Sequence, residues 1–264
     1  MPDDLFSVKD QIVLVSGGSR GIGRAIAAGF AERGAQVVIT GRDSTSLEPA
    51  ARDIRGTHTV IPIACDVSRR EQIEALVQDV LDRFRRIDTL VNVAGVNRRK
   101  PALEFTEDEY AFVLDINLKG AFFLSQAVGR HMVERGSGSQ INIASLTTDR
   151  AIVNVLPYAM SKAGLGQMTR GLAAEWGPSG VRVNAIAPGF ILTDLTQKLW
   201  SDPNMQAWGL TNTPLGRLGQ PEDMIGAAIF LASPAAAFLT GQILYVDGGF
   251  TAAWRWPIPE GGGQ

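Results

Sequence analysis

Three residues near the middle of the chain, Ser145, Tyr158 and Lys162, carry side chains that together could move a proton to or from an oxygen atom. Tyr158 and Lys162 are four positions apart, so on a helix they share one face and point into the same pocket. A tyrosine normally loses its proton near pH ~10, and a positive charge nearby favours the phenolate. We therefore expect Lys162 to lower the pKa of Tyr158, so that the phenol acts as acid or base near neutrality. Ser145 would hold the oxygen of a carbonyl or alcohol beside it.

A glycine-rich turn, SGGSRGIG at residues 16–23, lies near the start of the chain. It follows the apolar run 12–15, which predicts a buried strand, and it opens the segment 22–32, which predicts a helix. A turn of this kind lets the backbone approach a pyrophosphate, and the helix N-terminus favours its negative charge. Gly17, Gly21 and Gly23 have a GxxxGxG spacing. The position of the turn between a strand and a helix predicts a dinucleotide site.

With these motifs in this order, the chain resembles the short-chain dehydrogenase/reductase family from about residue 8 to residue 250. Further motifs of the family are matched by Asp66-Val67 before the third predicted helix, by Asn92-Val93-Ala94-Gly95, and by Pro188-Gly189 with Thr193 after it. Val93 departs from the family's usual Asn, which puts one sheet-stabilising hydrogen bond in question.

The resemblance implies roles for individual residues. It makes Asn117, Ser145, Tyr158 and Lys162 the catalytic set, in which Asn117 anchors a water that links Lys162 to bulk solvent. It places the following residues at the cofactor: Gly17, Ser19, Arg20, Gly21, Ile22, Gly23, Arg42, Asp66, Val67, Asn92, Ala94, Gly95, Tyr158, Lys162, Pro188, Gly189, Ile191 and Thr193. It implies the transfer of a hydride between a nicotinamide and a carbonyl carbon, while Tyr158 supplies or accepts the proton.

Short apolar runs alternate with helical segments along the chain, which predicts a parallel sheet with helices on both faces. Strands are expected at 12–15, 37–40, 60–64, 90–93, 141–144, 181–186 and 243–246. Ser68 with Glu71 and Thr106 with Glu109 have the spacing of capping boxes at two helix starts. The sequence thus predicts one Rossmann-like, doubly wound α/β domain over residues 1–264, with a substrate lid at about 194–220 and an irregular tail at 251–264.

Charge around the predicted second strand bears on the choice of cofactor. NAD sites usually carry an acidic residue at the end of this strand, whereas NADP sites supply an Arg nearby. Here Gly41 occupies the acidic position and Arg42 follows it, while Arg20 lies in the glycine-rich turn. Asp43 is the main contrary observation, but it comes two residues too late to hold the ribose. We expect NADP(H) to be preferred over NAD(H).

Bulk properties restrict the possible partners. The chain has 264 residues, 45% of them apolar, and a net charge of −2, which gives no reason to expect nucleic acid or an anionic membrane as partner.

Met224–Val246 has no charged residue, but Ser233-Pro234 and Thr240-Gly241 interrupt it, so we expect a helix, a loop and a strand there. Cys65 is expected to be a buried small hydrophobe. The acidic N-terminus lacks an apolar signal core, so we expect a cytoplasmic protein. The family resemblance implies a homotetramer.

Neither histidine has the spacing of a metal ligand, and the chain has no Cys cluster or acidic metal loop, so we expect no catalytic metal.

Substrate choice depends on the basic segment Arg98-Arg99-Lys100, just after the fourth predicted strand. Arg98 or Arg99 could clamp a carboxylate, although a basic loop facing solvent or a neighbouring subunit remains an alternative. Around this segment the chain resembles the gluconate 5-dehydrogenases and deoxygluconate dehydrogenases of the family, which interconvert a secondary alcohol and a ketone on sugar acids such as gluconate and 5-ketogluconate. A 3-oxoacyl-[acyl-carrier-protein] reductase is the second interpretation, and a non-catalytic NADP(H)-binding sensor or scaffold is the third.

Overall fold

The computed structural model describes residues 4–252 and contains one sheet of seven parallel strands. Their order across the sheet is β3-β2-β1-β4-β5-β6-β7, and every neighbouring pair is parallel. The strands are β1 (Ile12–Ser16), β2 (Gln36–Gly41), β3 (Ile61–Ala64), β4 (Thr89–Asn92), β5 (Gly138–Ile143), β6 (Val181–Pro188) and β7 (Ile243–Val246). All seven strands predicted from the sequence are confirmed, with differences of a few residues at their ends.

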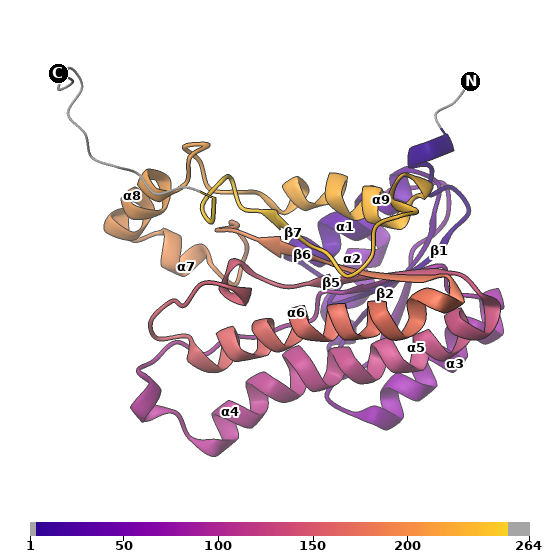
Figure 1. Cartoon of the computed structure of the whole chain (residues 1–264), viewed down its shortest axis with the longest axis horizontal. Helices are drawn as coiled ribbons and strands as arrows, with labels where there is room; N and C mark the ends of the chain where they lie inside the picture. Colours follow the sequence, from indigo (N-terminus) through magenta and orange to yellow (C-terminus); the bar gives the residue numbers. More distant parts are fainter. Residues whose placement is uncertain (1–3, 253–264) are drawn as a thin grey trace.

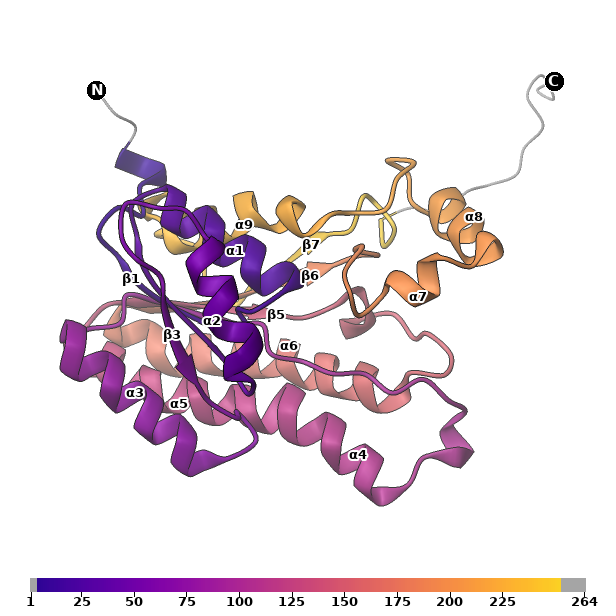
Figure 2. The same cartoon turned by 180° about the vertical axis from the view of Figure 1, so that it is seen from behind.

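Helices cover both faces of the sheet (Figures 1 and 2). They are α1 (Gly21–Glu32), α2 (Ser44–Asp53), α3 (Arg70–Phe84), α4 (Glu107–Leu114), α5 (Ala121–Arg135), α6 (Leu156–Trp176), α7 (Gln197–Trp200), α8 (Pro203–Asn212) and α9 (Ile225–Ala232). One face carries α1, α2 and α9, and the other carries α3, α5 and α6. The predicted doubly wound arrangement is therefore confirmed.

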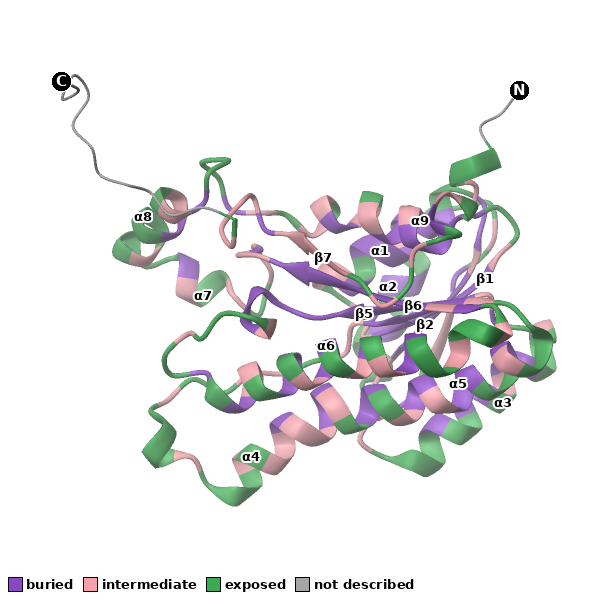
Figure 3. Cartoon of the chain, viewed as in Figure 1, coloured by how far each residue is buried: buried purple, intermediate pink, exposed green. Residues whose placement is uncertain are grey.

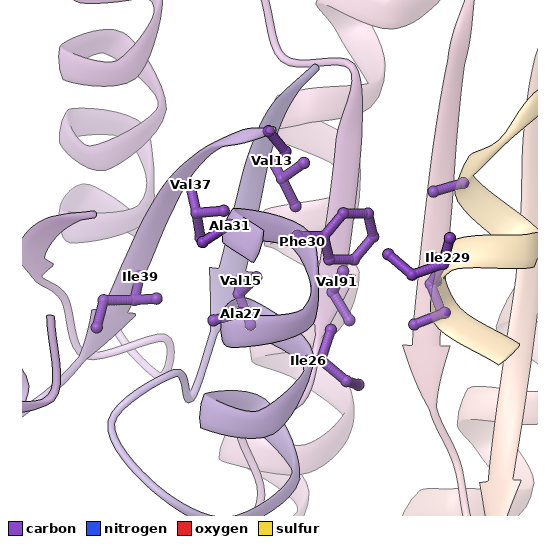
Figure 4. Close-up of a cluster of buried hydrophobic side chains, with 14 of the residues drawn as sticks. Val13, Val15, Ile26, Ala27, Phe30, Ala31, Val37, Ile39, Val91 and Ile229 are labelled. Atoms are coloured by element: carbon purple, nitrogen blue, oxygen red, sulfur yellow. The ribbon is translucent and has the colours of Figure 1, made fainter. Parts of the chain in front are cut away.

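Alternate residues of the central strand β1 join two separate cores. Val13 and Val15 of β1 join the core under α1 and α9, while Leu14 between them joins the core under α3 and α5. Figure 4 shows Phe30 of α1 lying over the strands and beside Ile229 of α9. Both faces of the central strands are buried (Figure 3), which explains why the sequence shows continuous apolar runs rather than alternation.

The strand order reverses direction between β1 and β4, which are neighbours in the sheet but not consecutive in the chain. In open sheets of this kind the loops beyond the carboxyl ends of these strands leave a crevice for ligands. The predicted glycine-rich turn, Asn92–Gly95 and Ser145 follow β1, β4 and β5, so they all lie at this one edge.

One of the two predicted capping boxes is confirmed and the other is wrong. Thr106 caps α4, and its hydroxyl and the Glu109 carboxylate make the two reciprocal bonds of the motif. Ser68 does not cap α3, because that helix begins after Arg69 and the Ser68 hydroxyl donates instead to Asp66 Oδ1 at 2.8 Å. The Ser68 hydroxyl is hydrogen-bonded to the aspartate two residues before it and does not cap the helix. The capping spacing alone is therefore misleading here.

The uncharged segment Met224–Val246 forms α9, a short 3₁₀ turn and β7, as predicted. Within residues 4–252, one helical stretch, Glu107–Arg135, has the length and mean hydropathy of a membrane span. Half of its most apolar 18-residue window is buried inside the fold, as in a core helix. The predicted tail at 251–264 lies outside the described residues from 253 onward.

Candidate active site

The predicted catalytic residues come from three elements that meet at the carboxyl edge of the sheet. Tyr158 and Lys162 lie in the first turns of α6, and Ser145 follows β5 directly. Asn117 lies in a π-helical segment, Asp115–Gly120, that joins α4 to α5. π-Helical turns are rare and are often found at functional sites, and this one places the Asn117 amide against the loop after β4.

The Tyr158 phenol is influenced by two neighbours, the Ser145 side chain and the charge of Arg99. Burial raises the pKa of Tyr158, while the Ser145 hydroxyl and the Arg99 guanidinium act in the opposite direction. The expectation that Lys162 brings this pKa down toward neutrality is wrong for the free chain. The Lys162 ammonium lies 5.7 Å from the centre of the Tyr158 ring and makes its hydrogen bond elsewhere.

Lys162 is almost completely buried, at 4% exposure, and its Nζ donates to the backbone carbonyl of Ile143 at 2.6 Å. Burial lowers the pKa of Lys162 to about 8. A Cβ added at Gly95 would lie 3.8 Å from Nζ and 3.5 Å from Asn117 Oδ1. Gly95, Asn117 and Lys162 are thus brought together, as predicted from their motifs.

The Asn117 amide is hydrogen-bonded to both backbone groups of Val96, its N–H and its carbonyl. Its Oδ1 accepts from the Val96 N–H at 2.8 Å, and its Nδ2 donates to the Val96 carbonyl at 2.9 Å and to Ser161 Oγ at 3.0 Å. The side chain is therefore fully engaged within the protein.

Close packing explains the glycines of the first turn. Gly17 has φ +71°, and a Cβ there would lie 2.8 Å from the Ala94 nitrogen. A Cβ at Gly23 would lie 2.2 Å from the Gly17 carbonyl oxygen. No side chain caps the N-terminus of α1, so its first backbone N–H groups have no competing side-chain acceptor. This cradle fits a dinucleotide phosphate.

The end of β2 carries the charges expected for a 2′-phosphate. The Arg20 and Arg42 side chains are exposed and make no hydrogen bond or ion pair with any residue in the described range 4–252. The Asp43 carboxylate caps α2 by accepting from the Thr45 N–H at 2.9 Å and its hydroxyl at 2.7 Å, bonds that lower the pKa of Asp43. Asp43 is thereby committed to its own helix rather than to a ribose.

Most of the other residues predicted at the cofactor lie around the same edge. Ser19 Oγ is 3.9 Å from a Cβ added at Gly41, and Asp66 and Val67 follow β3. Ile22 lies in the first turn of α1, and the Thr193 side chain is 3.5 Å from a Cβ added at Gly21.

Two predicted cofactor residues have side chains that point into the protein. Asn92 Nδ2 donates to Ser125 Oγ and to Asn142 Oδ1, both at 2.9 Å, so its side chain is directed into the protein interior. Ile191, in the loop after Pro188-Gly189, packs in the core. Val93, the departure from the family pattern, packs against the same core, and Ser16 contacts the backbone of Val93.

The three cations after β4 have different surroundings. The Arg98 guanidinium stacks on the Phe112 ring, 4.8 Å from its centre. Lys100 forms an ion pair with Glu109. Arg99 is exposed, makes no hydrogen bond or ion pair within residues 4–252, and has the charge that acts on Tyr158. The sequence alone could not separate Arg98 from Arg99, because the ring that holds Arg98 lies on α4.

An aromatic cluster that the sequence reasoning missed anchors the predicted lid. Phe190 contacts Trp200 of α7, Trp208 of α8 and Phe250, with ring centres 5.0, 5.5 and 4.8 Å apart. Phe190 and Phe250 each follow a glycine just after β6 and β7, and that shared position is the signal by which they could have been found. A cavity of about 570 Å³ is formed partly by the predicted lid itself and is lined by Leu192, Gln206, Leu210, Arg217, Leu218, Gln220, Glu222 and Asp223. None of the four predicted catalytic residues lines this cavity.

Comparisons with known proteins agree with this geometry. Residues 17–251 match the family described as Enoyl-(Acyl carrier protein) reductase. The chain is 38% identical to gluconate 5-dehydrogenase from Gluconobacter oxydans over 255 residues, covering 95% of this chain and 98% of the relative. It is 42% identical to 2-dehydro-3-deoxy-D-gluconate 5-dehydrogenase from Pseudoalteromonas atlantica over 253 residues, covering 93% and 97% of the two chains. A gluconate 5-dehydrogenase from Burkholderia cenocepacia, solved in complex with NADP and tartrate, superposes with a TM-score of 0.91 at 39% identity, covering 95% and 99% of the two chains.

Proposed function

The chain belongs to the short-chain dehydrogenase/reductase family, and from this premise we propose that it interconverts a secondary alcohol and a ketone on a sugar acid, with NADP(H) as cofactor. The observation that carries the proposal is the buried Tyr158 phenol, whose pKa is influenced by Ser145 and by an Arg99 guanidinium that has no ion-pair partner among residues 4–252. Two independent relatives that act on gluconate-type acids support the choice of substrate class.

Each catalytic residue has a separate task in this proposal. When bound, the nicotinamide supplies or accepts the hydride. Tyr158 gives its proton to the oxygen in reduction and takes it back in oxidation. Ser145 donates a hydrogen bond to the same oxygen and stabilises the charge that develops there. The buried Lys162 ammonium would hold the cofactor ribose and, with the cofactor bound, would supply positive charge on the Tyr158 side of the site. Asn117 holds the loop that borders Lys162, and its predicted role in anchoring a water remains part of the proposal.

Arg99 is assigned to the substrate carboxylate. Arg98 and Lys100 have partners within the protein, so Arg99 is the cation of this segment that is available to a ligand. A guanidinium can bind a carboxylate through two parallel hydrogen bonds. The solved relative that was crystallised with tartrate, itself a hydroxy acid, supports a site for acids of this kind.

NADP(H) is assigned as the preferred cofactor. The support is local: Gly41 replaces the acid at the end of β2, Asp43 is occupied as a helix cap, and Arg20 and Arg42 are available for the 2′-phosphate. The residues named above at the glycine-rich turn, at Asp66-Val67 and at Pro188–Thr193 would hold the rest of the dinucleotide.

We also propose a homotetramer in the cytoplasm, with residues 194–220 as the substrate lid. Large apolar side chains are exposed on the helical face of α5 and α6, including Phe122, Leu156 and Met160, at 37%, 50% and 44%. Burying such side chains between copies with two-fold axes would remove them from water. Light scattering at micromolar concentration should give the mass of four chains, and a stable monomer would contradict the assembly.

A substrate panel tests the function directly. Purified protein is mixed with NADPH or NADP and with 5-ketogluconate, gluconate, neutral ketones, polyols and a 3-oxoacyl thioester, and the absorbance of the reduced nicotinamide is followed. We expect 5-ketogluconate to have the highest kcat/KM among the ketones. A better rate with the thioester would replace this proposal with the acyl-reductase function, and no turnover of any member would favour a non-catalytic role.

A further inference from the structure

The hydroxyl of Ser161 connects two of the elements that form the site. Its Oγ–H donates to the backbone carbonyl of Tyr158 at 2.6 Å, one turn earlier on α6. The same oxygen accepts from Nδ2 of Asn117 at 3.0 Å. Ser161 is 0% exposed and Asn117 is 1% exposed, so water does not replace either bond readily.

The contacts of Asn117 show what Ser161 contributes. A carboxamide has two N–H donors and one acceptor oxygen. The Val96 N–H fixes Oδ1 as the acceptor, so Nδ2 must face the Val96 carbonyl and Ser161. Ser161 therefore satisfies the second N–H of Asn117, which would otherwise be an unpaired donor in the protein interior.

We propose that Ser161 is a positioning residue, whose hydroxyl sets the turn of α6 carrying Tyr158 against the Asn117–Val96 pair and the loop after β4. This inference rests on the proposed roles of Tyr158 and Asn117, but it does not depend on which ketone is the substrate. Gly95, next to Val96 in that loop, lies beside both Asn117 Oδ1 and Lys162 Nζ. A shift of Asn117 would therefore change the alignment of Tyr158 and Lys162 with the loop.

Small displacements of this kind have large effects on rate, because a misplacement of about 1 Å can cost roughly 100-fold. Ser161→Ala removes the acceptor and leaves an Asn117 N–H unpaired. We expect kcat to fall roughly 10- to 100-fold, with a much smaller change in the KM for NADPH, since the glycine-rich turn and Arg42 are untouched.

Thr169 provides a matched control on the same helix. Its hydroxyl is 0% exposed, donates to the Leu165 carbonyl at 2.8 Å and accepts from Asn142 Nδ2 at 2.9 Å. The local chemistry is the same as at Ser161, but its buried partner is not one of the proposed catalytic residues. Thr169→Val should lower stability by a similar amount and leave kcat within about twofold of the wild type.

The experiment compares wild type, Ser161→Ala, Ser161→Cys, Thr169→Val and Tyr158→Phe with the best substrate of the panel. For each protein kcat, the KM for NADPH and the midpoint of thermal unfolding are measured. Cysteine fills the space of serine but is a weak hydrogen-bond acceptor, so Ser161→Cys should resemble Ser161→Ala. A loss of kcat at Ser161 that exceeds the loss at Thr169, at comparable midpoints, supports the positioning role.

Equal kcat values for the Ser161 and Thr169 variants would overturn the inference and leave Ser161 as an ordinary buried serine. If Tyr158→Phe also kept full activity, the proposed function itself would fail. An inactive Tyr158→Phe together with a fully active Ser161→Ala would reject the inference alone.

Discussion

Two clusters of positive charge lie at the same edge of the sheet. They differ in how many of their cationic side chains contact other residues of the protein. Near the end of β2, the Arg20 and Arg42 side chains have no hydrogen bond or ion pair among residues 4–252, and the nearby acid, Asp43, is engaged as a helix cap. After β4, Arg98 stacks on the Phe112 ring and Lys100 pairs with Glu109, whereas Arg99 makes neither a ring contact nor an ion pair in the described part of the chain.

The difference separates what local sequence determines from what tertiary packing determines. At the cofactor end, the charges lie in the residues that directly follow β1 and β2, so the positions of these strands in the sequence predict its chemistry. At the substrate end, the availability of each cation depends on α4, which contributes Phe112 and Glu109. We therefore expect substitutions at the cofactor end to act on the cofactor alone, and those at the substrate end to discriminate between substrates.

The largest expected effect on kcat comes from replacing Tyr158, which lies between the cofactor end and the substrate end of the site. Tyr158→Phe removes the proton donor and should lower kcat by ~10²–10⁴-fold, since general acid–base catalysis contributes about that much. Binding of NADPH, followed by its fluorescence, should remain close to wild type. Turnover close to that of the wild type would show that the chemistry resides elsewhere.

Arg42→Ala tests the cofactor end. A hydrogen bond to a charged group contributes ~1.5–3 kcal/mol, so the variant should lose roughly 10- to 100-fold in kcat/KM for NADPH and little for NADH. The ratio between 5-ketogluconate and a neutral ketone should stay constant. Similar losses with both cofactors, or a native preference for NADH, would contradict the assignment of Arg42.

Gly41→Asp should reverse the preference between NADPH and NADH, and its effect on kcat/KM should be smaller than that of Arg42→Ala. A Cβ at Gly41 would lie 3.6 Å from Leu47 Cδ1, an ordinary contact, so the side chain fits without displacing the fold. The new carboxylate should repel a 2′-phosphate and accept from the ribose hydroxyls of NADH. We expect the NADPH/NADH ratio of kcat/KM to fall by roughly tenfold; an unchanged ratio would mean that the cofactor does not pass the end of β2.

A smaller effect is expected at the substrate end, where Arg99→Ala should shift the pH dependence of alcohol oxidation. Oxidation requires the Tyr158 phenolate, and the Arg99 charge lowers the pKa of Tyr158. Arg99→Ala should therefore move the rise of kcat/KM with pH to higher pH, by less than about one unit because the guanidinium is exposed to solvent. A neutral alcohol is the appropriate substrate, since its binding does not involve Arg99. A shift to lower pH would contradict the contact.

Sequence reasoning predicted the fold and most of the candidate site because their signals are local. The strands appear as apolar runs, and the catalytic residues follow motifs whose order matches the family. The pKa of Tyr158 was predicted with the wrong direction, because the spacing of Tyr158 and Lys162 does not reveal that Nζ donates to Ile143. Arg99 could not be distinguished from Arg98, nor the Phe190 cluster recognised, because their contacts join segments far apart in the chain.

The most direct test of the account compares Arg99→Ala with Arg98→Ala, using 5-ketogluconate and an uncharged ketone as substrates with NADPH. We predict that Arg99→Ala lowers kcat/KM for the acid by roughly 10- to 100-fold, through KM, and leaves kcat/KM for the neutral ketone within about twofold of the wild type. Arg98→Ala should affect both substrates alike, because its guanidinium rests on Phe112. If Arg99→Ala changes kcat/KM for the acid and for the neutral ketone by the same factor, the sugar-acid function is contradicted.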